Sequence, residues 1–209
     1  MKLTTFILTA SLGLAATPGA QAAIIFDSLA PYAGAYVPVS YNWFAGQSFK
    51  TDAQAYTLTG VTLRMGKADS PGGNFFVKLY DATGAGSKPG AMLVPLTGSA
   101  DPATAGDYTY TGSQALSANT AYWVVAGGSG GPGSYNWWAQ FSGLPAAGTT
   151  IGLVASNSQG ASWDGPYPSL FLDMQVTAVP EPGQWAMMGM TLLGAGGFVL
   201  RQRRAQTAK

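Results

Sequence analysis

Two reactive side chains are missing from this sequence of 209 residues, which contains no histidine and no cysteine. Without imidazole or thiolate groups, Ser-His-Asp and Cys-His catalysis are excluded, together with the usual transition-metal sites. The lack of cysteine also excludes disulfides and a lipid attached to a cysteine at a signal cleavage site. The stability of the folded chain must therefore come from its hydrophobic core.

Acidic side chains are scarce, because charged residues make up only 9% of the chain and Glu181 is its single glutamate. The other acids are eight aspartates, which leave a carboxylate pair of the glycosidase kind as a chemical possibility. Most of them stand in turn contexts such as Asp81-Ala82-Thr83-Gly84, where turn chemistry explains the residue without catalysis. We therefore expect no enzyme, and glycan cleavage is the least favoured hypothesis.

The charge of the central region argues against nucleic acid, and its acids offer little to a metal ion. Residues 23–179 contain five lysines and arginines against eight aspartates, a net charge of −3, which does not suit a phosphate backbone. Calcium is the only metal worth considering, with Asp69, Asn74 and Asp164 as candidate ligands. No loop shows regular ligand spacing, so we predict no cofactor.

The N-terminus has the pattern of a secretory signal peptide. Lys2 precedes an apolar run at residues 3–16, and Thr17-Pro18-Gly19 interrupts that run. Ala20-Gln21-Ala22 then provides the small residues that signal peptidase requires. Cleavage after Ala22 would make Ala23 the first residue of the mature chain, so we assign residues 1–22 to the signal peptide.

The C-terminus combines three features in a fixed order: Pro180-Glu181-Pro182, an uncharged apolar run at residues 185–200, and the basic residues Arg201, Arg203 and Arg204. Arginines after an apolar run are typical of a transmembrane helix whose basic end stays in the cytoplasm. Sixteen helical residues cover about 24 Å, less than the hydrocarbon core of roughly 30 Å. We therefore expect a single helix that anchors the chain only weakly in the membrane.

This ending resembles the PEP-CTERM sorting signal of exported bacterial proteins, in which a PEP triplet, a short span and arginines occur in the same order. The resemblance covers residues 179–209. It implies processing near Pro180-Glu181-Pro182 by an exosortase, a membrane transpeptidase. It also implies a Gram-negative host that makes exopolysaccharide or biofilm matrix.

The region between the two termini, residues 23–178, has the pattern of β-structure. Apolar residues alternate with polar ones at 61–65, 75–80, 120–125 and 170–176, and turn residues separate these segments. The glycine-rich sequence at 127–133 lacks the residues of a phosphate loop and predicts a hairpin loop. About nine or ten short strands predict an all-β fold, a two-sheet β-sandwich that is most simply a jelly roll.

The same alternation predicts which side chains form the core. Five residues are expected in one core: Leu63, Val77, Leu79, Val124 and Leu172. Lys78 and Asp173 fall on the opposite faces of their strands and are expected to face water. Residues 45–126 also resemble the choice-of-anchor domains that precede such sorting signals, through Gln47-Ser48-Phe49 and Val77-Lys78-Leu79-Tyr80. That resemblance implies anchoring and no particular chemistry.

One sequence occurs almost twice, as "YNWFAG" at 41–46 and "YNWWAQ" at 135–140. If both copies are strands, large aromatic residues lie on both faces, and one set could form a surface platform for sugar rings. The candidates for this platform are Tyr41, Trp43, Tyr135, Trp137 and Trp138. The simpler interpretation is that the core buries one set and loops cover the other, since aromatic residues dominate most β cores.

The leading functional hypothesis is therefore an exported, non-enzymatic protein of the cell surface or extracellular matrix. Its expected partners are signal peptidase and an exosortase as processing enzymes, the inner membrane as a transient anchor, and exopolysaccharide. The alternative is a carbohydrate-binding module that uses exposed aromatic residues. Solvent exposure of the tryptophans distinguishes the two hypotheses.

Overall fold

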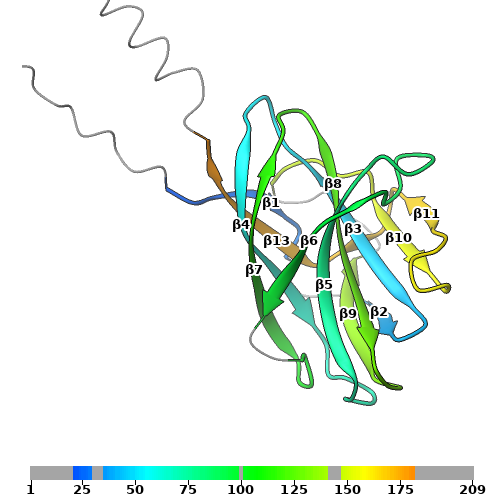
Figure 1. Cartoon of the computed structure of the whole chain (residues 1–209). Coiled ribbons are helices and arrows are strands. Elements are labelled where there is room, and N and C mark those ends of the chain that lie inside the picture. Colours follow the sequence, from blue (N-terminus) through cyan, green and yellow to red (C-terminus); the bar gives the residue numbers. More distant parts are fainter. Residues whose placement is uncertain (1–20, 30–34, 99–100, 141–146, 182–209) are drawn as a thin grey trace, which may run out of the picture.

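The computed structural model describes residues 21–29, 35–98, 101–140 and 147–181 (Figure 1). Within these ranges the chain forms thirteen β-strands and no helix, which confirms the all-β prediction with more strands than expected. The strands are β1 (Ala23–Asp27), β2 (Ala35–Ser40), β3 (Phe44–Lys50), β4 (Tyr56–Met65), β5 (Asn74–Asp81), β6 (Met92–Gly98), β7 (Gly106–Leu116), β8 (Ala121–Ser129), β9 (Ser134–Gln140), β10 (Leu153–Ser156), β11 (Asp164–Tyr167), β12 (Phe171–Leu172) and β13 (Met174–Pro180).

Most strands belong to one curled antiparallel sheet, in the order β1-β13-β4-β7-β6-β5-β8-β3-β10-β11. The sheet turns back on itself at β6, which pairs with β5 through its first residues and with β7 through Thr97 and Gly98. The half that contains β4, β7 and β13 therefore lies over the half that contains β3, β5 and β8 (Figure 1).

Strand β9 extends the half of the sheet that contains β4, because its Trp137 lies opposite Met65 at the end of β4. Along its length β9 pairs with β2, and near its end with β12. The prediction of a hairpin loop at residues 127–133 is wrong, because residues 127–129 belong to β8 and pair with β5. Residues 130–133 lead from β8 to β9, and these two strands belong to different halves of the sheet.

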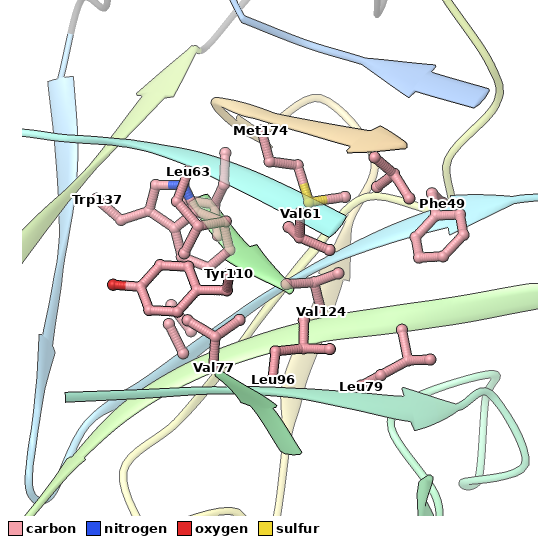
Figure 2. Packing of buried hydrophobic residues seen from close by; sticks show 14 of the residues in the cluster. Phe49, Val61, Leu63, Val77, Leu79, Leu96, Tyr110, Val124, Trp137 and Met174 are labelled. Carbon is pink, nitrogen blue, oxygen red and sulfur yellow. The ribbon is translucent and has the colours of Figure 1, made fainter. Parts of the chain in front are cut away.

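The hydrophobic core fills the space between the two halves (Figure 2). The five residues predicted to share one core are all fully buried in it: Leu63, Val77, Leu79, Val124 and Leu172. The prediction is confirmed because one face of each strand packs against the opposite half. A second, smaller cluster around Trp123 and Val125 lies on the outer face of β8, where the indole Nε1 of Trp123 donates to the carbonyl oxygen of Ser87 at 2.8 Å.

A β-bulge changes the alternation within β4. Against β13, Leu58 and Gly60 lie opposite the adjacent residues Ala178 and Thr177, so β4 contains one extra residue at this point, and the side chains that follow move to the other face. Leu58 and Val61 are consequently both fully buried although they lie three residues apart. Beyond the bulge, Leu63 and Met65 face the core as the simple alternation predicts.

Asp173 does not face water as predicted, because it is fully buried. It lies between β12 and β13, where the chain changes its partner from β9 to β4 and the alternation is interrupted. Its backbone N–H donates to the carbonyl oxygen of Trp138 at 2.9 Å, and its carbonyl oxygen accepts from the indole of Trp137 at 2.9 Å. Its carboxylate Oδ1 accepts from the Gln140 side-chain amide at 2.5 Å.

The two ends of the domain lie together. Strand β1 begins and β13 ends at the same end of the molecule (Figure 1), because Ala23 lies opposite Ala178 in their antiparallel pair. We call this the terminal end; β4 begins there at Tyr56, opposite Pro180. We call the opposite end, where β4 finishes at Met65, the distal end.

Candidate functional site

Two of the five candidate platform residues belong to the core. Tyr135 and Trp137 lie on the inner face of β9 and are fully buried, so their assignment to a surface platform is wrong. The hydroxyl of Tyr135 donates to the carbonyl oxygen of Gly72 at 2.9 Å, and burial raises the pKa of this phenol. Because side chains alternate along a strand, Asn136 and Trp138 lie on the outer face of β9.

Tyr41 and Trp43 are exposed, but they do not lie on a strand. Ser40 and Trp43 exchange backbone hydrogen bonds of 2.8 and 3.3 Å, which makes residues 40–43 the turn between β2 and β3. Tyr41 is 44% exposed and Trp43 is 38% exposed. Tyr41 borders a pocket of about 500 Å³ whose other wall is residues 130–133, Gly-Gly-Pro-Gly. That wall has no polar side chain with which to recognise a ligand.

Trp138, the remaining candidate, is half-buried on the outer face of β9 beside Tyr36 of β2. The two residues are opposite each other in the β2–β9 pair, with ring centroids 6.1 Å apart and an interplanar angle of 79°. Tyr36 is 53% exposed. Tyr36 was not among the predicted platform residues, although exposed Tyr36 and Pro38 alternate with Val37 and Val39 along β2 as in a half-buried strand.

These two rings line a pocket near the distal end, which we call the Tyr36–Trp138 pocket. Its volume is about 360 Å³, and its lining is completed by Asn136 and by residues 66–69, which follow β4. Within this segment Lys67 and Asp69 are exposed and carry opposite charges. The pocket thus combines two aromatic rings with a cation, a carboxylate and an amide.

Asn136 is held in one orientation beneath this pocket. Its side chain is almost fully buried, and its Nδ2 donates to the carbonyl oxygen of Lys67 at 2.7 Å and to Oδ1 of Asp69 at 3.2 Å. Because both of these partners are acceptors, the amide nitrogen must face them. The Oδ1 atom of Asn136 then has no hydrogen-bond partner among the described residues. This acceptor is buried beneath the lining of the pocket without a compensating hydrogen bond from the described residues.

Gly66 allows the segment that follows β4 to lie directly on β9. Its N–H donates to the carbonyl oxygen of Asn136 at 2.7 Å. A Cβ atom at this position would lie 3.3 Å from Cβ of Asn136 and 3.6 Å from Cε2 of Trp138. A larger residue would therefore press against the floor of the pocket.

The C-terminal motif begins at the terminal end. Pro180 is the last residue of β13, and the N–H of Glu181 donates to the carbonyl oxygen of Ala55 at 3.0 Å. The Glu181 carboxylate accepts a long hydrogen bond of 3.4 Å from the Thr57 hydroxyl. Two prolines within three residues predict an extended segment outside the preceding strand, and this prediction is wrong for Pro180. Beyond Ala178 no residue of β1 pairs with β13, and a proline is tolerated at such a strand end.

The other sorting and cleavage residues are described only in part. Ala22 is exposed, and Ala23 is the exposed first residue of β1. Five predicted residues lie outside the described ranges: Ala20, Pro182, Arg201, Arg203 and Arg204. The predicted span at 185–200 also lies outside them, and no helix among the described residues is long and apolar enough to cross a bilayer.

Two of the candidate aspartates, Asp81 and Asp107, accept hydrogen bonds from neighbouring protein groups. Asp81 accepts from the Thr83 hydroxyl at 2.7 Å and from the N–H of Ala91 at 2.9 Å, which fits the turn role inferred from sequence. Asp107 accepts from Arg64 at 2.8 Å, and this hydrogen bond lowers the pKa of the Asp107 carboxyl group.

The three calcium candidates belong to different elements. Asp69 follows β4, Asn74 begins β5 and Asp164 begins β11. In the part of the chain that the structure describes, no group of three or more histidine, cysteine, aspartate or glutamate side chains could hold a metal ion.

No protein-family model matches this chain, and no curated protein shows significant similarity to it. The resemblance to PEP-CTERM proteins therefore depends on the motif residues themselves.

Proposed function

We propose that this chain is an exported, non-enzymatic protein of the cell surface or extracellular matrix. Signal peptidase removes residues 1–22, and residues 179–209 hold the chain briefly in the inner membrane of a Gram-negative bacterium. An exosortase then processes the chain at Pro180-Glu181-Pro182, and the released domain joins exopolysaccharide or biofilm matrix. The observation that best supports this proposal is the pairing of Ala23 with Ala178, which brings both processing sites to one end of the domain.

The strand boundaries support the same order of events. Strand β1 begins at Ala23, so cleavage after Ala22 leaves every residue of this strand in place. Strand β13 continues to Pro180, so the motif begins at the last residue of this strand and no linker separates the two. The motif would then lie where the folded domain meets the membrane, within reach of a membrane enzyme.

We interpret the curled sheet as a two-sheet β-sandwich of the jelly-roll type, because its two halves enclose one core and β6 pairs with one strand of each half. The absence of histidine and cysteine and the turn roles of aspartates such as Asp81 support a non-enzymatic function.

Replacement of Glu181 by glutamine tests the sorting function. The substitution keeps both prolines and the backbone hydrogen bond to Ala55, so it changes the charge of the motif with little change in shape. We expect the unprocessed form to accumulate in the membrane. Immunoblots of membrane and medium fractions, from hosts with and without the exosortase, measure this directly. Thr57→Val is the matched control, because it removes the contact to Glu181 and leaves the motif intact.

The opposite result would support a purely mechanical role for the motif. A rigid spacer depends on its prolines, so alanine at positions 180 and 182 would impair release while Glu181→Gln had no effect. Normal release of the glutamine variant, or equal release from both hosts, would contradict the sorting hypothesis.

A further inference from the structure

We propose that the Tyr36–Trp138 pocket binds one or two sugar rings of a neutral polysaccharide. This inference goes beyond the sorting function and does not depend on it, because the pocket lies near the distal end of the domain. It also differs from the platform predicted from sequence, with which it shares only Trp138.

The aromatic part of the pocket suits the apolar face of a pyranose ring. The Tyr36 and Trp138 rings are nearly perpendicular, at 79°, so together they form a corner with two faces. A sugar ring presents C–H groups on its faces and hydroxyl groups around its edge. Its face can pack on one aromatic ring while its edge reaches polar groups beside it.

The polar part of the pocket suits hydroxyl groups, which both donate and accept hydrogen bonds. The exposed Asp69 carboxylate is an acceptor that lines the pocket. The Lys67 ammonium group is a donor. Neighbouring hydroxyl groups of one sugar can satisfy such a mixed set, whereas a hydrocarbon ligand would leave it unsatisfied.

Charge and size limit the ligand further. Lys67 and Asp69 nearly cancel each other, and the negative charge of residues 23–179 disfavours a polyanion. A volume of about 360 Å³ lies at the lower end of the range for small-molecule sites, which is roughly 300–1,000 Å³. A proline-rich peptide would also pack on aromatic rings, but its backbone offers few donors to Asp69. A neutral glycan therefore fits better than either alternative.

Affinity electrophoresis of the full chain tests this inference. The chain is kept in a detergent without sugar groups and run through native gels that contain a β-glucan, a galactomannan or an α-glucan. Parallel gels contain a polyuronate or a proline-rich peptide coupled to a neutral carrier polymer. We expect at least one neutral polysaccharide to retard the chain, and neither of the other two polymers to do so.

Three variants assign the binding to the pocket. Tyr36→Ala and Trp138→Ala should each weaken binding about tenfold or more, as is usual when a central aromatic contact is lost. Trp43→Ala is the matched control, because it removes an exposed aromatic residue from the β2–β3 turn and should bind like the wild type. Tyr36 is more than half exposed, so its variant should fold even if Trp138→Ala does not, and unchanged thermal unfolding verifies this.

Several outcomes would overturn the inference. They are no retardation by any of the neutral polysaccharides, equal retardation of wild type and Tyr36→Ala, and retardation by the polyuronate or the peptide alone. Failure of exosortase processing would not affect this assay, so the two proposals can fail separately.

Discussion

Tyr110 belongs to the hydrophobic core (Figure 2) and lies opposite Val61 in the β4–β7 pair. The residue is 4% exposed, and its hydroxyl oxygen has no hydrogen-bond partner among the described residues. Burial is the main reason that the pKa of Tyr110 is raised well above its ordinary value, with the Asp101 carboxylate acting in the same direction. A polar group buried in this way costs stability, because it gives up its contact with water without compensation.

We therefore expect Tyr110→Phe to increase the free energy of unfolding by about 1 kcal/mol, since it removes the unsatisfied hydroxyl and keeps the ring. Tyr135→Phe is the control and should decrease it by about 1 kcal/mol, because that hydroxyl donates to Gly72. Urea unfolding at pH 7 measures both changes. Destabilisation by Tyr110→Phe would show that the hydroxyl has a partner after all.

The same phenol should make stability depend on alkaline pH. Above about pH 10 an unfolded tyrosine loses its proton, whereas buried Tyr110 keeps it until a higher pH. The folded state then binds more protons than the unfolded state, so stability falls as the pH rises between these two pKa values. Stability curves measured between pH 8 and 11 should decline less steeply for Tyr110→Phe than for the wild type.

At the scale of elements, the junction between β12 and β13 depends on Asp173. Its carboxylate accepts from Gln140, and its backbone joins β9 through Trp137 and Trp138. Asp173→Ala should reduce the free energy of unfolding by about 2–3 kcal/mol, because a buried hydrogen bond to a charged group is lost. Lys78→Ala should cost under about 1 kcal/mol, because this half-buried lysine only lies over the Phe76 ring, 4.1 Å from its centroid. Equal costs in urea unfolding would contradict this difference.

Alternation along single strands was enough to predict the core positions of Leu63, Val77 and Leu79. It could not predict the bulge in β4 or the burial of Asp173, because both depend on how a strand pairs with its neighbours. The structure of each copy of the repeated Tyr-Asn-Trp sequence also depends on strand pairing. At 41–43 it forms a turn between strands of different halves, and at 135–137 it lies within β9. The sequence contains nothing local that distinguishes these two outcomes.

The candidate site was predictable to a similar extent. Trp138 was among the candidates for a sugar platform, because large aromatic residues on both faces of a strand cannot all belong to one core. Tyr36 becomes its neighbour only when β2 pairs with β9, about 100 residues later in the sequence. Asn136 and Asp69 meet only when Gly66 brings the segment after β4 onto β9.

At the scale of the whole molecule, the two proposals concern opposite ends of one domain. Strand β4 starts beside Pro180 and finishes beside Trp137, and its ten residues at about 3.3 Å each span about 30 Å. A chain held in the membrane by residues 185–200 would therefore present the Tyr36–Trp138 pocket away from the bilayer. The pocket would be open to glycans both before and after release.

This orientation can be measured in the anchored chain, because a sequence without cysteine allows a dye to be attached at one introduced thiol. Ala53→Cys lies at the terminal end, near the Ala55 carbonyl that accepts from Glu181, and Ser70→Cys lies at the distal end, where its backbone pairs with Ser134. Both positions are exposed. With the full chain in vesicles that contain an acceptor dye in the headgroup layer, energy transfer should be clearly stronger from position 53 than from position 70. Equal transfer from both positions would mean that the domain lies on its side, and the pocket would then not be directed away from the membrane.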